Sequence, residues 1–202
     1  MTATVSPQQT LTFEDFLEHY PEDGRYELID GELVRILATR QHDDTADFIA
    51  DEMKAEVKQH QLNYKVSSRI VLATTTSTGN TQGRHPDVSV VDLSVWRSNR
   101  SAYTALREPI QLAVEVVSTN WEDGYVDKLD EYERLGIPEF WFVDYLALGS
   151  RTDLGNPKRP AVFVCLLDNQ QRYQVGRFQG SEPILSRTFP NLQLTVDCIL
   201  AV

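Results

Sequence analysis

Two acidic residues in this chain each lie inside an apolar run that is typical of a buried strand. Asp87 stands in the segment RHPDVSVV at 84–91, and Glu115 stands in LAVEVV at 112–117. A buried carboxylate is unfavourable unless a cation or hydrogen bonds compensate its charge. On neighbouring strands the two acids would repel each other, and a divalent metal ion between them would relieve that repulsion. The pattern therefore predicts a shared metal site, although Asp87 could instead be an acid that follows a proline and caps a turn.

A lysine on the next predicted helix faces the apolar side of that helix. Between about Tyr125 and Leu135 the spacing is helical, and at about 100° per residue Lys128 lies inside the apolar arc. The charged residues around it fall outside that arc: Asp127, Asp130, Glu131 and Arg134. A lysine directed at the sheet needs a carboxylate partner, and Glu115 or Asp87 could provide one. Otherwise its stem crosses the edge of the core and its ammonium reaches water.

Local signals predict the helices and strands that carry these residues. Helical spacing and capping residues predict helices from Thr12 to about His19, from Gln41 to about Gln59, from about Tyr125 to Leu135, and briefly near the C-terminus. Strands are expected at Arg25–Ile29, Glu32–Leu37, Tyr64–Leu72, around Asp87, at Ile110–Val117, from Phe140, at Ala161–Leu167 and at Tyr173–Phe178. The dipeptide Asp30-Gly31 predicts a hairpin turn between the first two strands, and the last two form a second antiparallel pair.

Two segments lack such signals. The stretch Thr74–Gly83 is polar, contains glycine and has no period, so it predicts a mobile loop. The stretch from Leu93 to Glu108 has no clear period either. The order of elements favours a mixed α/β (α+β) fold, with a central mixed sheet flanked by helices and antiparallel hairpins at both ends.

Length and composition favour one globular domain over residues 1–202, with residues 1–10 as a flexible tail. No apolar stretch approaches the roughly 18 residues that crossing a membrane requires. Because the N-terminus carries no secretion signal, we expect a cytoplasmic protein with no membrane partner. The formal net charge of −11 opposes a polyanionic partner unless cations are concentrated locally or a bound metal ion changes the local field.

Four motifs together resemble the PD-(D/E)XK nuclease superfamily. They are Pro86-Asp87, the strand around Glu115, the run from Asp127 through Tyr132 to Asp144, and the segment Tyr26–Leu33. Within the superfamily, the chain is similar to a restriction-endonuclease-like branch whose motif lysine comes from the following helix. The superfamily pattern has that lysine two residues after the acid, where this chain has Val117, and Lys128 is the matching residue on the helix.

The resemblance implies a restriction-endonuclease-like core and Mg²⁺-dependent hydrolysis of DNA phosphodiester bonds, with Mn²⁺ able to substitute. It implies that Asp87, Glu115 and the backbone carbonyl of Val116 hold the metal ion. Lys128 would orient or help to deprotonate the attacking water, or contact the scissile phosphate. Glu27 would bind a second metal ion or a water on the metal, although an acid near an Asp-Gly turn can also simply be solvated.

One short stretch interleaves cations with aromatic residues in an otherwise acidic chain. It runs from Trp96 to Arg107 and contains Arg97 and Arg100. Such a pattern is typical of nucleic-acid contacts, and Arg84, beside the predicted loop, could add to it. The same residues could form an oligomer contact instead. Because cutting both strands of DNA generally requires two sites, we expect a homodimer.

Three alternatives stay open at the level of sequence. The missing strand lysine and the negative charge would also suit a nuclease-like fold that has lost catalysis and serves as a binding or assembly module. The same metal site could instead hydrolyse a small phosphorylated substrate. His42, which shares a helical stripe with Ala46 and Ile49, either faces the site or is a hydrogen-bonded histidine at the edge of the core.

Overall fold

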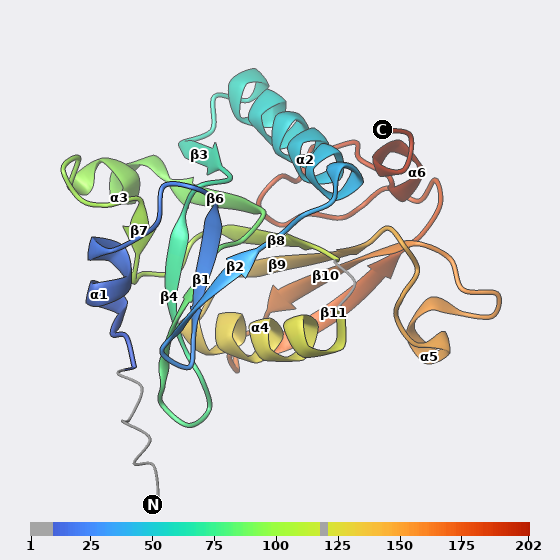
Figure 1. Ribbon diagram of the computed structural model, residues 1–202. Helices are drawn as coiled ribbons and strands as arrows, with labels where there is room; N and C mark the ends of the chain where they lie inside the picture. The colour runs from blue at the N-terminus through green and yellow to red at the C-terminus, as the bar shows by residue number, and fades with distance from the viewer. Residues whose placement is uncertain (1–9, 118–120) are drawn as a thin grey trace, which may run out of the picture.

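The computed structural model describes residues 10–117 and 121–202 (Figure 1). The tail expected at residues 1–10 therefore lies, except for Thr10, outside the described residues. The helices are α1 (Phe13–Glu18), α2 (Arg40–Gln59), α3 (Leu93–Ser98), α4 (Trp121–Leu135), α5 (Arg151–Leu154) and α6 (Val196–Ile199). The strands are β1 (Arg25–Ile29), β2 (Glu32–Ile36), β3 (Tyr64–Ser67), β4 (Val71–Thr75), β5 (Thr81–Arg84), β6 (Val88–Asp92), β7 (Ala105–Leu106), β8 (Leu112–Val116), β9 (Glu139–Asp144), β10 (Ala161–Leu167) and β11 (Tyr173–Phe178).

One sheet contains β11, β10, β9, β8, β6 and β3, in this order. Its strands pair antiparallel except β8 and β9, which run parallel. Parallel neighbours need a long crossover connection, and α4 lies in the chain between these two strands. Every residue of β8 and of β9 is buried, as expected for central strands that are covered on both faces.

A second sheet contains β2, β1, β5, β4 and β7. Its first two strands form the predicted hairpin, with Ile29 paired to Glu32 across the turn. The turn residues Asp30 and Gly31 have φ angles of 49° and 79°, which aspartate tolerates and glycine adopts without steric cost. β1 also pairs with β5 through Leu28 and Gly83, and this pairing joins the hairpin to the rest of the sheet.

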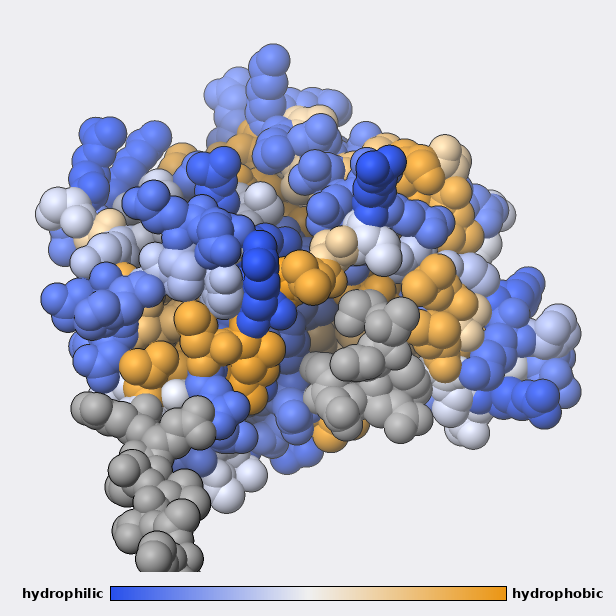
Figure 2. All heavy atoms as spheres, viewed as in Figure 1, coloured by the Kyte–Doolittle hydropathy of each residue, from blue (hydrophilic) through white to orange (hydrophobic). Residues whose placement is uncertain are grey.

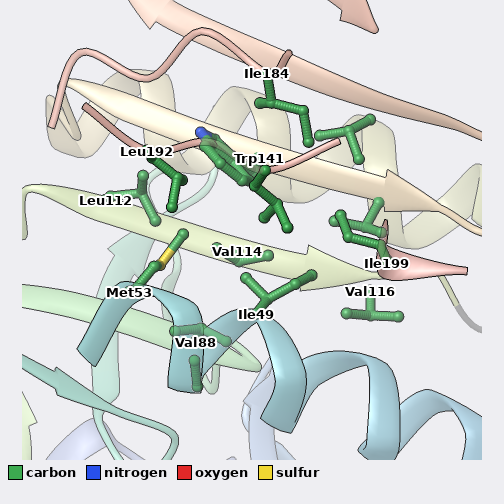
Figure 3. Close-up of a cluster of buried hydrophobic side chains, with 14 of the residues drawn as sticks. Ile49, Met53, Val88, Leu112, Val114, Val116, Trp141, Ile184, Leu192 and Ile199 are labelled. Atoms are coloured by element: carbon green, nitrogen blue, oxygen red, sulfur yellow. The ribbon is translucent and has the colours of Figure 1, made fainter. Parts of the chain in front are cut away.

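The larger hydrophobic cluster lies between α2 and the six-stranded sheet (Figure 3). Ile49 and Met53 of the helix are one turn apart and have no exposed surface. They belong to the same cluster as Val88, Val114 and Trp141 of the sheet. The predicted amphipathic helix is confirmed, and its apolar stripe fixes α2 against β6 and β8.

A second cluster contains side chains from α4 and from the alternate positions of the same strands. It includes Tyr132 of the helix together with Ala113, Val117 and Phe140. Because side chains alternate along a strand, Ala113 and Val117 lie on the opposite face from Val114. Glu115 has the same parity as Ala113 and Val117, so it lies on the face of the sheet that α4 covers.

The strand predicted at Tyr64–Leu72 is wrong in its continuity. The chain forms β3 up to Ser67 and then begins β4 at Val71, in the other sheet. The break falls at Ser68 and Arg69, which are exposed, and the Arg69 N–H donates to the Ser67 hydroxyl at 3.2 Å. Apolar residues on both sides of the break made two strands look like one.

The mobile loop predicted at Thr74–Gly83 is also wrong, because most of it forms the β4–β5 hairpin. Two of its polar residues, Thr74 and Gln82, are buried with partners from elsewhere in the chain. The Thr74 hydroxyl donates to Glu131 at 2.5 Å, and the Gln82 amide donates to Asp30 at 3.0 Å. At Gly83 an added Cβ would lie 2.8 Å from the Phe16 ring, so glycine is needed for close packing.

The aperiodic segment 93–108 contains α3 and the short β7, which pairs parallel with β4. The predicted mixed α/β class with flanking helices is confirmed, and the antiparallel pairs β1–β2 and β10–β11 lie at the outer ends of their sheets. The strands, however, divide between two mixed sheets where one central sheet was expected. Within the described ranges, no helix is long and apolar enough to cross a membrane.

Candidate active site

Asp87 and Glu115 come together through the register of β6 and β8. These strands are antiparallel, and Val88 lies opposite Val114. Asp87 precedes Val88 and Glu115 follows Val114, so the two acids occupy facing positions at one end of the strand pair. The two residues are only 5% and 7% exposed. The link is direct, because the N–H of Val116 donates to Asp87 Oδ2 at 2.8 Å.

Lys128 joins this pair from α4. Its Nζ lies 2.8 Å from Glu115 Oε2 and 3.0 Å from Glu27 Oε1. One turn further along α4, the Tyr132 hydroxyl donates to Glu115 Oε1 at 2.6 Å. Both oxygens of Glu115 therefore have a donor from the same helix. The ammonium of Lys128 therefore forms ion pairs with Glu115 of β8 and Glu27 of β1, and it is not simply solvated at the edge of the core.

Glu27 is held from behind by a buried ion-pair network. Its Oε1 accepts from the His85 N–H at 3.1 Å, and its Oε2 lies 3.2 Å from Arg84 Nη1. The same arginine donates through Nε to Glu131 Oε2 at 2.7 Å. Glu27 is 4% exposed, so it is not a solvated acid beside a turn. Arg84, suggested above as a nucleic-acid contact, is 5% exposed and directs its charge to two buried acids.

Arg25 at the start of β1 contacts the outer side of Asp87. Its Nη1 lies 3.3 Å from Asp87 Oδ1, and its Nη2 contacts the carbonyls of His85 and Pro86 at 3.2 Å. The arginine side chain is 30% exposed, and it lines a cleft of about 890 Å³ together with His85 and Asp87. Nothing in the hairpin sequence distinguished Arg25 from the solvated residues around it, so it was missed.

His42, in the first turn of α2, contacts both the acid and the strand backbone. Its Nε2 lies 3.3 Å from Asp87 Oδ2 and 3.1 Å from the carbonyl oxygen of Val116. The residue is 5% exposed, and its Nδ1 has no hydrogen-bond partner among the described residues. Of the two alternatives, the structure favours a histidine that faces the site. The helical stripe with Ala46 was the sequence signal.

Burial and neighbouring charges shift the ionisation of these groups in opposite directions. Burial raises the pKa of Glu115 to about 7. The Lys128 ammonium offsets only part of this rise, and the negative charges of Asp87 and Glu27 increase it. Burial opposes ionisation of Asp87 too, but the hydrogen bond and charge of His42 hold its pKa below the ordinary value. Beside Glu115 and Glu27, the pKa of Lys128 is raised despite burial, so its amine stays protonated.

The donor set suits a magnesium ion that keeps some of its waters. Mg²⁺ usually takes only one or two carboxylates from a protein. Asp87 and Glu115 offer two, and the Val116 carbonyl offers a third hard oxygen. Among the described residues, no three His, Cys, Asp or Glu side chains are grouped closely enough to enclose an ion by themselves. Burial raises the pKa of Glu115 and the charges of Asp87 and Glu27 add to that rise, so a divalent cation bound there would favour its ionised form.

The remaining predicted arginines do not converge on this site. Arg97 and Arg100 are exposed and line a separate pocket of about 820 Å³. Arg107 lies elsewhere, where it pairs with Glu14 and stacks over the Phe13 ring at 4.8 Å. The structure therefore brings together Asp87, Glu115, Lys128 and Glu27, and it separates them from the surface cations.

The site also contains Tyr132 and Glu131, for which no role was predicted. Glu131 falls outside the apolar arc of the helix, and that position predicts a solvated side chain. The ring of Tyr132 does pack in the core, but its hydroxyl reaches Glu115. Glu131 is 2% exposed because Arg84 and Thr74 bind its carboxylate. These contacts come from residues far away in the sequence.

Comparisons with known proteins identify the family and the fold. A family model, Uma2, described as "Putative restriction endonuclease", matches residues 13–197. The crystal structure of a putative nuclease belonging to DUF820 from Anabaena variabilis ATCC 29413 aligns with a TM-score of 0.72 and 14% identity. The alignment covers 95% of this chain and 98% of the other. At that identity the similarity establishes the fold alone. No curated protein matches the chain.

Proposed function

The chain belongs to the Uma2 family of restriction-endonuclease-like proteins, and from this premise we propose that it is a metal-dependent endonuclease that hydrolyses phosphodiester bonds of DNA. The observation that carries the proposal is the convergence of two buried acids from neighbouring strands with a lysine from α4. Lys128 lies 2.8 Å from Glu115, whose strand neighbour Val116 is hydrogen-bonded to Asp87. These groups could hold a metal ion and place a cation beside it, a combination that suits metal-assisted phosphodiester hydrolysis.

The metal ion would be Mg²⁺, with Mn²⁺ able to substitute. Asp87, Glu115 and the carbonyl of Val116 would hold it, and Glu27 would hold a second ion or a water. When bound, such an ion supplies Lewis-acid stabilisation of the negative charge that develops on the phosphate. His42 and Arg25 contact Asp87 from two sides, so they would fix the orientation of its carboxylate.

Lys128 would act as a hydrogen-bond donor. Because the carboxylates of Glu115 and Glu27 raise its pKa, its amine stays protonated and is a poor acceptor for the proton of the attacking water. A fixed ammonium instead stabilises negative charge on the scissile phosphate or orients the water through a hydrogen bond. The hydroxyl of Tyr132 would keep Glu115 in place while Lys128 turns towards the substrate.

The substrate would approach through the 890 Å³ cleft that exposes Asp87. Arg25 and Arg69 line this cleft together with Tyr20 and Tyr103. Two guanidinium groups can contact phosphates, and aromatic rings can contact bases. The same cleft also carries the acids Glu18, Glu22, Asp43 and Asp47, so a nucleic-acid strand would enter it together with bound cations that offset this charge.

Cleavage of supercoiled plasmid DNA tests the proposed function. In Mg²⁺ or Mn²⁺ the native protein should nick or linearise the plasmid, and Asp87→Asn should lower the rate at least about 100-fold. Asp44→Asn, an exposed acid on α2, is the matched control and should cut like the native protein. A native protein that leaves DNA intact but hydrolyses a small phosphodiester would favour the metabolite hydrolase. One that hydrolyses neither would favour the inactive binding module.

We also propose that the protein is a homodimer, since cutting both strands requires two sites. The edge strand β2 offers a surface for the second copy. Within the described part of the sheet β2 pairs only with β1, and Leu33 and Leu37 are 39% and 78% exposed. Figure 2 shows hydrophobic side chains on the side of the molecule that carries this hairpin. Light scattering should give twice the chain mass, and Leu37→Lys should shift it towards the monomer.

A further inference from the structure

A pocket of about 820 Å³ lies apart from the candidate active site, and the charged residues that line it are mainly cations. It is bounded by the end of α2, by β3, by α3 and by the segment 99–106. Its cations come from α2, β3, α3 and the segment after α3: Lys54, Lys58, Lys65, Arg97 and Arg100. Among the described residues that line it, Glu108 is the one acid. A positive pocket of this size is unexpected in a chain whose formal net charge is −11.

Most of these cations have no acidic partner. Lys54 is the exception, since its Nζ lies 2.9 Å from Asp51 Oδ1. The Nζ of Lys65 lies 5.3 Å from the centre of the Trp96 ring. For Lys58, Arg97 and Arg100, the described residues provide no carboxylate oxygen within 4.0 Å.

These unpaired positive charges repel one another unless an anion binds between them. Elsewhere in the described part of the chain some exposed arginines are paired, as Arg134 is with Asp130, and others, such as Arg151 and Arg159, are not. What distinguishes this surface is therefore the grouping of several unpaired cations around one pocket. The upper left of Figure 2, over α3, is correspondingly covered mainly by hydrophilic side chains. The pocket therefore has the charge pattern of an anion site.

The cation pocket borders the cleft of the candidate active site. Tyr103 and Thr104 line both. Tyr103 is 65% exposed, so its ring is available to a ligand that passes between them. The segment is anchored at Thr104, whose carbonyl accepts from the Val71 N–H at 3.0 Å, and β7 follows it. A linear polyanion could therefore occupy the cation pocket and reach Asp87 at the same time.

We propose that the cation pocket binds the phosphodiester backbone of the DNA strand that is cut at Asp87, with Tyr103 stacking on a base between the two positions. The inference rests on the proposed function and deepens it. Cations spread over three elements and the segment after α3 match several successive phosphates better than a single small anion. Such contacts fix the register of the strand and carry no sequence information themselves.

Charge reversal in the pocket tests the inference. The variant Lys58→Glu/Arg97→Glu/Arg100→Glu changes three exposed residues that have no acidic partner. Its affinity for fluorescently labelled DNA, measured by anisotropy in EDTA, should fall at least about tenfold at low salt. The slope of log affinity against log salt should decrease by about 3. The matched variant carries Arg151→Glu, Lys158→Glu and Arg159→Glu, which change the net charge by the same amount. Its loss of DNA affinity should be less than about a third of the loss in the pocket variant.

A variant expected to bind DNA more tightly provides a second test, because misfolding can lower the affinity for DNA but does not raise it. Glu108→Lys removes the acid of the pocket and should raise both the affinity for DNA and the salt slope, the latter by about 1. Glu182→Lys, at an exposed position outside the pocket, should leave both unchanged. An equal loss in both triple variants would mean that net charge alone governs binding, and it would overturn the inference. So would unaltered affinity in the pocket variant, or no binding of DNA by the native protein.

The two proposals fail in different measurements. If Asp87→Asn cuts plasmid like the native protein, the proposed catalytic site is wrong whatever the anisotropy shows. If the native protein cuts and Asp87→Asn does not, yet the pocket variant binds DNA normally, only the backbone site is wrong. Native cleavage together with selective loss of binding in the pocket variant supports both.

Discussion

The ammonium group of Lys128 lies 2.8 Å from a carboxylate oxygen of Glu115, although the two residues come from a helix and a strand. The strand position that the superfamily pattern gives to lysine holds Val117, which is 2% exposed and packed in an apolar cluster. A charge at that position would lie among apolar side chains, which is unfavourable. The helix therefore supplies the cation that the strand does not, and it does so at hydrogen-bond distance from the acid.

Removing this ammonium should abolish most of the cleavage activity. Lys128→Met keeps a long side chain but has no charge, so we expect the rate of plasmid nicking to fall at least about 100-fold. Lys128→Arg restores a cation and should recover part of the rate. Lys158→Met, at an exposed position, is the control. Parental activity in Lys128→Met would remove this residue from the mechanism.

The stability of the metal-free protein should depend on the ionisation of Glu115. Burial raises the pKa of this carboxyl from its ordinary 4.5 to about 7. The folded state holds this proton more tightly than the unfolded state does. The resulting contribution of Glu115 to the free energy of unfolding is therefore fully present below about pH 4.5 and is lost as the pH rises through about 7.

Glu115→Gln cannot ionise, so it should lack this loss. As the pH rises from about 5 to about 8, the free energy of unfolding of the variant minus that of the native protein should increase by up to about 3 kcal/mol. Urea unfolding in EDTA at both pH values measures the difference. A difference that does not change with pH would show that Glu115 ionises normally.

The ion-pair network behind Glu27 should be important for stability. Arg84→Met leaves the carboxylates of Glu27 and Glu131 buried without their guanidinium, which should cost about 3–5 kcal/mol. Arg134→Met breaks an exposed pair with Asp130 and should cost less than about 1 kcal/mol. Urea unfolding gives both values. Equal costs for the two variants would mean that the buried network contributes no more than a surface pair.

Stacking at Tyr103 predicts a difference between two substitutions. Tyr103→Phe keeps the aromatic ring and should bind single-stranded DNA like the native protein. Tyr103→Ala removes the ring and should lose about 1–3 kcal/mol, the usual contribution of one stacked base. Anisotropy titrations measure both affinities. Identical affinities in the alanine and phenylalanine variants would exclude a stacking role for this residue.

Local sequence predicted the elements whose signals are local. The capping box at Thr12 and Asp15 forms as expected, and Asp30-Gly31 makes the β1–β2 turn. The stripe of Ile49 and Met53 fixes α2 on the sheet. In each case the residues that decide the structure are within one or two turns of one another, so the pattern alone was sufficient.

The errors occurred where distant residues decide the structure. Thr74 and Gln82 are polar and favoured a loop, but their partners Glu131 and Asp30 lie 57 and 52 positions away. Arg84 looked like a surface cation because its neighbours in sequence are polar. No local pattern reveals that a hydrogen-bond partner is available elsewhere, so buried polar residues were assigned to the surface.

The candidate site was predictable only where its residues interrupt a local pattern. Asp87 and Glu115 stood out because acids interrupt apolar runs, and Lys128 because it interrupts an apolar arc. Arg25 interrupts no pattern, and its role depends on the register that brings β1 beside the strand entrance at His85. Its contact with Asp87 became visible only in the folded chain.

Calorimetric titration with Mn²⁺ tests most directly whether Asp87 and Glu115 share one ion. We expect the native protein to bind at least one Mn²⁺ per chain, in competition with Mg²⁺. Asp87→Asn and Glu115→Gln should each weaken that binding at least about tenfold, because each removes a carboxylate ligand. Asp44→Asn should bind like the native protein. A native protein that binds no Mn²⁺, or two site variants that bind it as tightly as the native protein, would contradict a shared metal site.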